Sequence, residues 1–280
     1  MTLTRREVGA LLSRNGIRPS RALGQNFVVD PNTVRRIARL AAVGPGDRVL
    51  EIGAGLGSLT LALAETGAEV LAVELDRYLT PVLRSVVEPA GVGVLEGDAL
   101  RLDWEAVLGS AGGDGGWVLV SNLPYNVATP LVLTLLERAP SITRMLVMVQ
   151  REAGERLAAG VGHPAYGAVS VKVAYRARAR VVGRVPATVF VPQPNVESVL
   201  VAVERLAAPA VAVDEARFLA LVEAGFAHRR KMLRGALAGL VGDGAFEAAA
   251  VRPEARAEEL DVGTWGRLAA CAATSGPSPS

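Results

Sequence analysis

The sequence contains few residues that could form cross-links or bind metal ions. Cys271 is the single cysteine, which excludes an internal disulfide and a metal site built from several cysteines. The two histidines, His163 and His228, are expected to be structural or solvent-facing rather than catalytic. The composition therefore predicts a protein without a metal site.

The sequence also lacks a long apolar run. No run reaches the roughly 18 residues that a membrane-spanning helix needs, and residues 1–7 lack the apolar core of a signal peptide. Together with the single cysteine, this predicts a cytoplasmic protein without a membrane partner, and we expect a monomer. Half of the 280 residues are hydrophobic, which is enough for one large core and a smaller second one.

Lysine is scarce, since 28 of the 30 basic residues are arginine. Arginine binds phosphate through two hydrogen bonds and stacks on bases, although a genome-wide bias toward arginine would give the same count. The net charge is only +2, but the basic residues are clustered. One cluster, in residues 5–21, could be an arm that binds nucleic acid or a solvated helix.

Apolar runs alternate with helical patterns up to about residue 150. Strands are expected at 48–52, 69–73, 92–95, 117–120 and 143–149. Helices are expected at 31–43 and 129–137, and a further helix is expected to open within residues 53–60 and to end at about residue 66. This alternation predicts an α/β fold with a parallel, doubly wound sheet.

The pattern changes after residue 150. A helix is expected at 151–158, and two late strands are expected at 169–175 and 199–203. From Asp214 onward the period is helical, and one apolar face is predicted to include Phe218, Leu221, Val222, Gly225, Leu233, Leu237 and Leu240. The predicted division is a first domain at 1–206, a small all-α domain at 207–273 and a disordered tail at 274–280.

Three arginines alternate near the first of these late strands. Arg176, Arg178 and Arg180 would point to one face of a strand. They could contact RNA, or they could protect an exposed sheet edge.

The segment Asn122-Leu123-Pro124-Tyr125 follows the apolar run 117–120, where a strand is expected to end. The Asn122 side chain and the Leu123 backbone can each supply a carbonyl oxygen that accepts from an exocyclic amine. Such a pair would favour the pyramidal, nucleophilic form of the amine. Pro124 stiffens the loop, and Tyr125 offers a face on which a base can stack. The alternative is an ordinary turn after a strand.

Glycines 53, 55 and 57 lie between a predicted strand and a predicted helix, where glycine lets a ligand approach the backbone. Glu74 ends the second strand, placed to accept from ribose hydroxyls. Asp98 ends the third strand, placed to accept from an adenine amine. Each feature alone could belong to a turn or a dinucleotide site, but their order favours S-adenosylmethionine.

Seven motifs over residues 23–237 make the chain resemble the ribosomal RNA adenine dimethyltransferases, specifically the small-subunit type. They are Leu-Gly-Gln-Asn-Phe (23–27), Glu-Ile-Gly-Ala-Gly-Leu-Gly (51–57), Val-Glu-Leu-Asp (73–76), Glu-Gly-Asp-Ala (96–99), Asn-Leu-Pro-Tyr-Asn (122–126), Phe-Val-Pro-Gln-Pro-Asn-Val-Glu-Ser (190–198) and Phe-Ala-His-Arg-Arg-Lys-Met-Leu (226–233).

The resemblance implies a Rossmann-like, S-adenosylmethionine-dependent catalytic domain and a helical domain that docks on folded RNA. It implies that the cofactor contacts Asn26, Val28, Gly53, Gly55, Glu74, Asp98 and Asn122. The family usually has leucine at the position of Val28, where a backbone contact would be unaffected by the change.

The resemblance also implies the substrate contacts. Phe190 would be the second aromatic wall of the base pocket, unless it is a core residue. Phosphates would be bound by the cluster of Arg229, Arg230, Lys231 and Arg234, which could instead be a solvated helix face.

The implied activity is dimethylation of two adjacent adenines near the 3′ end of 16S ribosomal RNA, with a role in ribosome biogenesis. Two alternatives remain. One is the related enzyme that modifies a large-subunit adenine and confers macrolide resistance. The other is a non-catalytic factor that keeps the fold to bind RNA, which the intact Asn122 and Glu74 argue against.

Overall fold

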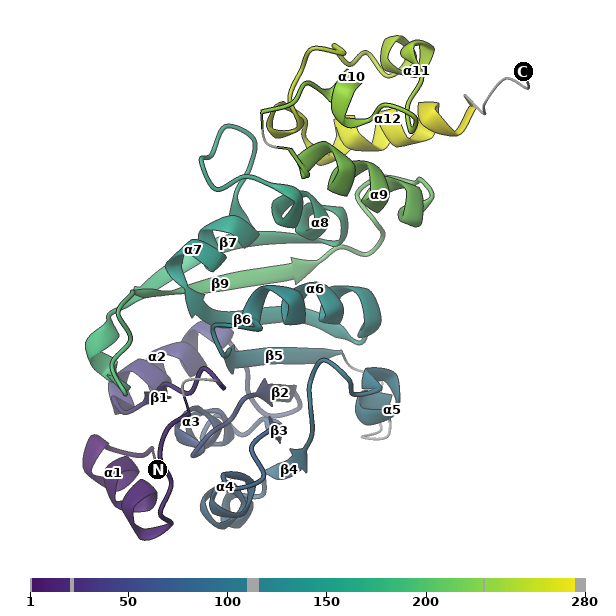
Figure 1. The fold of residues 1–280 in the computed structure, drawn as a ribbon. Helices are drawn as coiled ribbons and strands as arrows, with labels where there is room; N and C mark the ends of the chain where they lie inside the picture. Colours follow the sequence, from purple (N-terminus) through teal and green to yellow (C-terminus); the bar gives the residue numbers. More distant parts are fainter. Residues whose placement is uncertain (1, 21–22, 110–115, 229, 275–280) are drawn as a thin grey trace. The chain divides into compact units, whose positions relative to one another are not determined.

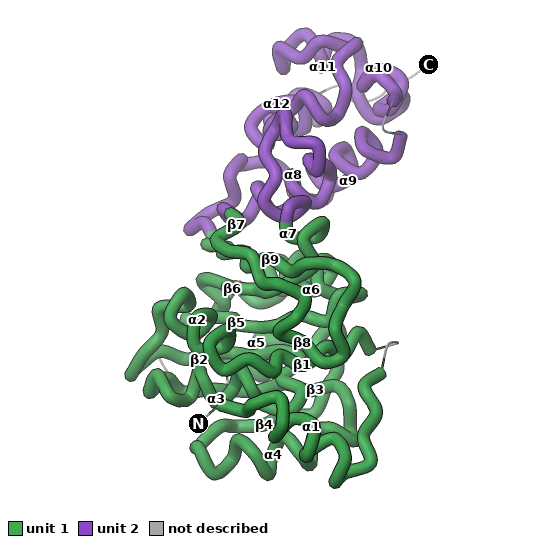
Figure 2. Tube along the Cα trace, turned by 90° about the vertical axis from the view of Figure 1, so that its left-hand side faces the viewer, with its two compact units in different colours: residues 1–154, 180–205 green, residues 155–179, 206–280 purple. Residues whose placement is uncertain are grey.

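The computed structural model of the chain describes residues 2–20, 23–109, 116–228 and 230–274 (Figure 1). Contacts divide the chain into two compact units, residues 1–154 with 180–205, and residues 155–179 with 206–280 (Figure 2). None of the helices in the described ranges has the length and hydropathy needed to cross a bilayer.

The first unit is organised around a seven-stranded sheet with the order β4-β3-β2-β5-β6-β9-β7. These strands are β2 (Arg48–Ile52), β3 (Glu69–Glu74), β4 (Gly93–Glu96), β5 (Trp117–Asn122), β6 (Ile142–Gln150), β7 (Ala177–Val185) and β9 (Ser198–Arg205). The chain builds β2, β3 and β4 toward one edge and then returns to add β5 and β6 on the other side of β2. Parallel α/β sheets bind ligands where the strand order reverses in this way.

The five strands predicted before residue 150 all form, and β2 to β6 pair in parallel. The sheet departs from a purely parallel one at β9, which runs antiparallel to β6. A second, two-stranded sheet pairs β1 (Phe27–Val28) with β8 (Phe190–Val191) in antiparallel register.

The helices of the first unit pack through apolar faces, those of the main core against the sheet and the N-terminal one against Phe27, Leu79 and Val82. They are α1 (Arg5–Arg14), α2 (Pro31–Ala41), α3 (Ser58–Ala64), α4 (Thr80–Val87), α5 (Trp104–Gly109), α6 (Ala128–Arg138) and the start of α7 (Arg151–Ala158). Asp30 caps α2 by accepting from the Thr33 backbone at 2.9 Å, and Pro31 occupies its first turn. Val34 and Ile37 of this helix share one core with Val118 and Val120 of β5.

The second unit has a core of its own, built largely from helices. These are α8 (Ala168–Arg176), α9 (Glu215–Phe226), α10 (Leu233–Ala236), α11 (Asp243–Ala248) and α12 (Val262–Thr274). Tyr175 stacks on Phe218 with ring centroids 4.7 Å apart, and Trp265 is fully buried. The tail predicted to be disordered lies outside the described residues from residue 275 onward, while Thr274 ends α12.

The strand predicted at 169–175 is wrong, because these residues form α8. The Ser170 hydroxyl donates to the Arg156 carbonyl at 2.7 Å and accepts from the Gly167 backbone at 3.2 Å, which fixes the first turn of the helix. Val171 and Tyr175, four residues apart, both reach the helical core. An alternating apolar pattern this short fits either structure, and here tertiary packing determines the result.

Two related predictions are also wrong. Arg176 does not share a strand with Arg178 and Arg180, because it ends α8 and pairs with Glu215. The apolar face of α9 does not extend to Leu240, which is 51% exposed. Helix α9 ends at Phe226, and a new helix begins at Leu233.

Candidate active site

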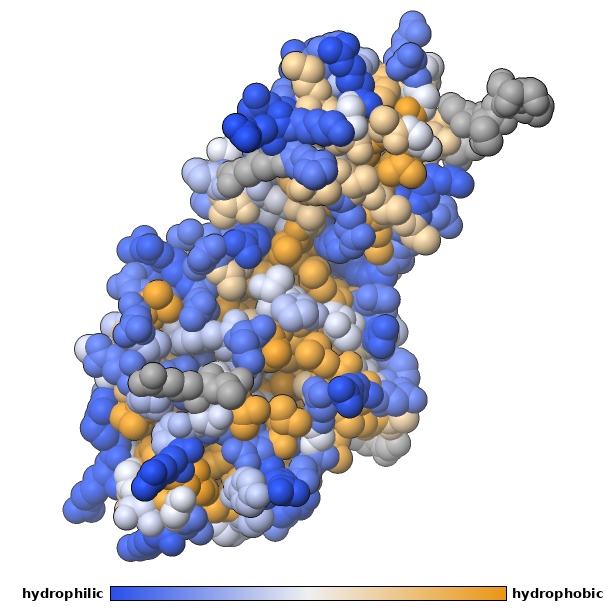
Figure 3. Space-filling model, in the orientation of Figure 1, coloured by the Kyte–Doolittle hydropathy of each residue, from blue (hydrophilic) through white to orange (hydrophobic). Residues whose placement is uncertain are grey.

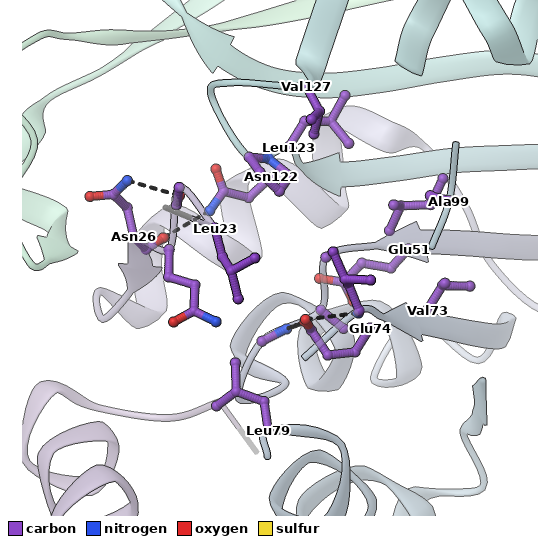
Figure 4. Close-up of a pocket in the computed structure, with 18 of the residues that line it drawn as sticks. Leu23, Asn26, Glu51, Val73, Glu74, Leu79, Ala99, Asn122, Leu123 and Val127 are labelled. Carbon is purple, nitrogen blue, oxygen red and sulfur yellow. Dashed lines mark hydrogen bonds between the residues drawn. The ribbon is translucent and has the colours of Figure 1, made fainter. Parts of the chain in front are cut away.

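A pocket lies at the carboxyl ends of the parallel strands β2, β3 and β5 (Figure 4). Its lining comes from the segments predicted to bind the cofactor and the base: residues 23–28, 51–56, 73–75, 97–100 and 122–125. These segments are distant in sequence. Four of them lie at or just after the carboxyl ends of the parallel strands β2, β3, β4 and β5, which meet at one edge of the sheet. Segment 23–28 contains β1, which belongs to the separate two-stranded sheet.

The glycine loop after β2 adopts backbone angles that favour glycine. Gly53 has φ of +73° and Gly55 has φ of +60°. A Cβ atom at Gly53 would lie 3.3 Å from Pro124 Cδ, and one at Gly55 would lie 3.0 Å from Phe27 Cδ1. Both glycines therefore allow this loop to pack closely against the other walls of the pocket.

Glu74 ends β3 with its carboxylate held by backbone amides. Oε2 accepts from the Gly55 N–H at 2.7 Å, and Oε1 accepts from the N–H groups of Leu75 at 2.9 Å and Asp76 at 3.0 Å. Burial raises the pKa of Glu74, and the three backbone donors oppose that rise. The result is an oriented acceptor on the pocket wall, and its role toward a ribose stays a prediction.

Glu51 lies close to Glu74 on the pocket floor, and its importance was missed in the sequence. It is 2% exposed, and its Oε2 atom has no hydrogen-bond partner among the described residues. Burial raises its pKa to about 8, and the negative charge of Glu74 adds to the effect. A glutamate between the apolar residues Leu50 and Ile52 of a buried strand was the signal that could have identified it.

Asp98, after β4, is a more exposed acceptor in the same pocket. Its Oδ1 accepts from the Leu100 backbone at 3.0 Å, and its Oδ2 lies 3.4 Å from Arg101 Nε. Arg101 is 87% exposed, so this ion pair contributes little to stability. Asp98 follows the end of β4 by two residues, and its role toward an adenine amine stays a prediction.

The Asn122 side chain at the end of β5 is oriented by the N-terminal segment. Its Nδ2 donates to the Asn26 carbonyl oxygen at 3.0 Å, which fixes the direction of the amide (Figure 4). The Oδ1 atom is buried and has no partner within the described part of the chain. A buried acceptor left unpaired costs about 1–3 kcal/mol, so this oxygen is suited to a ligand that donates a hydrogen bond.

The residues after Asn122 complete this wall. The Leu123 backbone N–H donates to the Met148 carbonyl at 3.0 Å, which continues the register of β5 on β6. Tyr125 lines the pocket, and its hydroxyl lies 2.8 Å from Ser198 Oγ. Burial raises the pKa of Tyr125, and the hydrogen bond to Ser198 opposes that rise.

Phe190 is not brought to the pocket lining with the other predicted residues. It is fully buried in the main core, where it pairs with Val28 across the β1–β8 sheet. Val28 and Phe27 themselves line the pocket. The role of Phe190 as a wall for a base stays a prediction.

Two further features of the pocket were missed in the sequence. Gln25 Nε2 donates to Asp76 Oδ2 at 2.8 Å, which ties the N-terminal segment to the turn after β3. Leu75 lines the pocket although it is 51% exposed. In Figure 3, apolar side chains occur in groups bordered by hydrophilic ones.

The predicted RNA-binding cluster belongs to the second unit. Arg230, Lys231 and Arg234 are exposed, and Arg234 Nη1 lies 3.4 Å from Glu254 Oε1 in a solvent-exposed ion pair. Arg229 lies outside the described residues. The function of this cluster stays a prediction.

The two histidines make local contacts. The backbone carbonyl of His228 accepts from the Lys231 N–H at 2.9 Å, and His163 Nδ1 accepts from the Ala165 backbone at 3.1 Å. The described residues include no group of three or more histidine, cysteine and carboxylate side chains that could hold a metal ion.

Comparison with known proteins assigns the family. Residues 17–274 match the family model described as ribosomal RNA adenine dimethylase. The chain is 46% identical to a ribosomal RNA small subunit methyltransferase A of Acidothermus cellulolyticus, over 94% of this chain and 92% of that protein. It is 47% identical to a protein of the same name from Nocardia farcinica, over 94% and 93% of the two chains.

Solved structures show the same fold at lower identity. A dimethyladenosine transferase from Plasmodium falciparum has a TM-score of 0.70 at 22% identity, covering 86% of this chain and 95% of that one. The 23S rRNA methyltransferase ErmE has a TM-score of 0.67 at 24% identity, covering 88% and 99%. With the family model matching nearly the whole chain, this protein belongs to the ribosomal RNA adenine dimethylase family of methyltransferases.

Proposed function

We propose that this chain transfers methyl groups from S-adenosylmethionine to the N6 amines of two adjacent adenines near the 3′ end of 16S ribosomal RNA, forming N6,N6-dimethyladenine. The observation that carries the proposal is the buried Oδ1 of Asn122, which has no hydrogen-bond partner among the described residues. This acceptor is held in place from the other side of the amide by Asn26.

The pocket lining fits S-adenosylmethionine by its chemistry. Glu74 supplies an oriented carboxylate for ribose hydroxyls, and Asp98 supplies an acceptor for an adenine amine. Leu75 offers an apolar surface for the adenine ring, and the glycine loop permits close approach of the ligand to the backbone.

The residues after β5 would orient the target amine. Asn122 Oδ1 and the Leu123 carbonyl accept its two N–H groups, which favours a pyramidal nitrogen with an available lone pair. When bound, the cofactor supplies the methyl group: the N6 lone pair forms the new N–C bond, the electron pair of the broken S–C bond stays on sulfur, and an N6 proton passes to water. Tyr125 would stack on the base once it is extruded from the RNA.

The small subunit is the favoured substrate because the relatives at 46–47% identity carry small-subunit names. The similarity to the 23S enzyme is at 24% identity and supports only the fold. We further propose that methylation occurs during ribosome biogenesis and that Arg230, Lys231 and Arg234 bind RNA phosphates.

Primer extension on ribosomal RNA from cells with and without the gene tests this function. Dimethylated adenines stop the polymerase, so a strong stop near the 3′ end of 16S RNA should disappear with the gene and return when the gene is restored. A stop that is lost only in 23S RNA would identify the large-subunit activity instead. Unchanged stops in both RNAs would contradict the proposal.

A further inference from the structure

Ser198 makes a buried contact with the candidate base-stacking residue. Its Oγ atom lies 2.8 Å from the hydroxyl of Tyr125, and the serine is fully buried. Either hydroxyl can donate. Tyr125 lines the pocket, whereas Ser198 is not among the lining residues, so the serine reaches the pocket only through the tyrosine.

The sheet holds Ser198 rigidly in place. Ser198 is the first residue of β9 and pairs with Gln150, the last residue of β6. Tyr125 follows β5, on the other side of β6, and the Leu123 N–H is bonded to the Met148 carbonyl. The hydroxyl pair therefore spans the end of β6 and joins the loop after β5 to a strand that the pocket does not otherwise use.

We propose that Ser198 is a positioning residue that fixes the ring of Tyr125 for base stacking, and that the second methyl transfer to each adenine depends on it more than the first. This inference rests on the proposed function. It assigns a role to Ser198, the last residue of the 190–198 motif. The sequence alone suggested a role only for Phe190 in this motif.

The difference between the two transfers follows from hydrogen-bond counting. The unmethylated amine presents two N–H groups to two acceptors, Asn122 Oδ1 and the Leu123 carbonyl. After one transfer the amine has a single N–H group, so only one of the two acceptors can hold it. Orientation of the N6-methyladenine base then relies more on stacking against Tyr125, and hence on the contact that holds its ring.

Each transfer has the same balance of atoms and electrons. One N–C bond forms from the N6 lone pair, and one S–C bond breaks with its electron pair remaining on sulfur. One N6 proton is released to water, and no oxidant or reductant is required. Ser198 takes no part in these bonds, so its removal should change rates without changing the chemistry.

The test uses the full-length protein, small subunits from cells lacking the gene, and saturating cofactor. Single-turnover reactions are analysed by mass spectrometry for adenine, N6-methyladenine and N6,N6-dimethyladenine. The variants are Ser198→Ala, Tyr125→Phe and the double variant. Ser198→Ala should slow the first transfer by about threefold and the second by about tenfold, on the scale of one lost hydrogen bond. The monomethylated product should accumulate.

The double variant separates positioning from general damage to the fold. If Ser198 acts through the tyrosine hydroxyl, adding Ser198→Ala to Tyr125→Phe should cause no further slowing. Further slowing in the double variant would overturn the inference. So would a Ser198→Ala enzyme with the product ratio of the wild type.

A readout without substrate or cofactor completes the test. The protein is labelled with carbon-13 at the tyrosine ring carbon that carries the hydroxyl and is studied by NMR. The Tyr125 resonance is identified by its absence in Tyr125→Phe. This resonance should shift in Ser198→Ala. An unshifted resonance would show that the hydroxyl pair does not form in solution and would overturn the inference. A wild-type protein that methylates neither adenine would instead contradict the proposed function.

Discussion

Glu51 and Glu74 lie close together on the pocket floor, yet their surroundings differ. Glu74 accepts three backbone N–H groups, which oppose the effect of burial on its pKa. Glu51 Oε2 has no such partner among the described residues, and its pKa is raised to about 8. The same residue type is therefore suited to holding a ligand at one position and is costly to ionise at the other.

Replacing Glu74 with alanine should weaken S-adenosylmethionine binding by about 1.5–3 kcal/mol, the value of a lost hydrogen bond to a charged group. Titration calorimetry measures this directly. Glu69→Ala, at the exposed start of the same strand, is the matched control and should bind normally. Equal affinity of Glu74→Ala and the control would rule out the ribose contact, provided that circular dichroism shows both variants to be folded.

Glu51 should make the stability of the protein depend on pH. Its pKa in the folded state, about 8, lies above the ordinary value of 4.5, so the unfolded chain loses the proton first. The stability provided by protonated Glu51 is full below pH 4.5 and is lost as the pH rises through about 8. Over that window its contribution should fall by up to about 1.4 kcal/mol per pH unit.

Urea unfolding at pH 5.5 and pH 8 checks this expectation. Glu51→Gln cannot ionise, so its free energy of unfolding should decrease less between the two pH values than that of the wild type. Other titrating groups affect both proteins equally and cancel in the comparison. Identical pH dependence of the two proteins would show that Glu51 is already charged at the lower pH.

At the scale of elements, the carboxyl end of helix α6 is capped by a side chain from strand β9, which is distant in sequence. Arg205, at the end of β9, donates to the carbonyls of Leu135, Leu136, Ala139 and Ile142 at 2.7–3.0 Å. The last carbonyls of a helix have no partner within the helix. One guanidinium here satisfies several such groups and also fixes the turn that leads into β6.

Arg205→Ala should therefore destabilise the protein by about 2–4 kcal/mol, as expected when several buried acceptors lose their donor. Arg138→Ala is the control, because Arg138 is exposed in the last turn of the same helix and its replacement removes the same charge. Urea denaturation of both variants measures the difference. Equal losses would mean that Arg205 acts only through its charge at the helix end.

The elements that could be predicted are those with a strong local pattern. The run 117–120 between glycines and Asn-Leu-Pro-Tyr becomes β5, and Asp30-Pro31 begins α2. Segment 169–175 could not be assigned, because its apolar residues fit both a strand and the helix α8. Local pattern also failed beyond Phe226, where α9 ends and the chain makes a separate short helix, α10.

The site was also predicted only in part, because local sequence patterns do not reveal contacts between distant segments. The sequence indicated Glu74, Asp98 and Asn122 because each follows a strand end, and all three line one pocket. It could not show that Asn26 orients Asn122 from 96 residues away or that Ser198 bonds to Tyr125. Such contacts depend on the completed tertiary fold, and no local pattern of residues encodes them.

At the scale of the whole molecule, the chain forms two compact units, each with a separate core. The candidate active site belongs to the first unit. The exposed basic cluster of Arg230, Lys231 and Arg234 belongs to the second. The proposed chemistry and the proposed phosphate contacts therefore fall on different units of the chain.

Replacing Arg230, Lys231 and Arg234 together with alanine should weaken RNA binding and lower the slope of log affinity against log salt by about two to three. Fluorescence anisotropy with a labelled small-subunit RNA fragment over a series of salt concentrations gives this slope. Exchanging the two arginines for lysine keeps the charge and should leave the slope unchanged. If the alanine variant also keeps the wild-type slope, the cluster is a solvated surface.

The central claim is that Asn122 Oδ1 accepts from the target amine, and the single-turnover methylation rate of Asn122→Ala tests it most directly. Small subunits lacking the modification serve as substrate, with S-adenosylmethionine saturating because Asn122 also lines the cofactor pocket. The rate should fall by a factor of about one hundred or more, as for the loss of a group that stabilises a transition state. RNA affinity should change little, because phosphate contacts dominate it. A near-normal rate, with both methyl groups still added to each adenine, would contradict the claim.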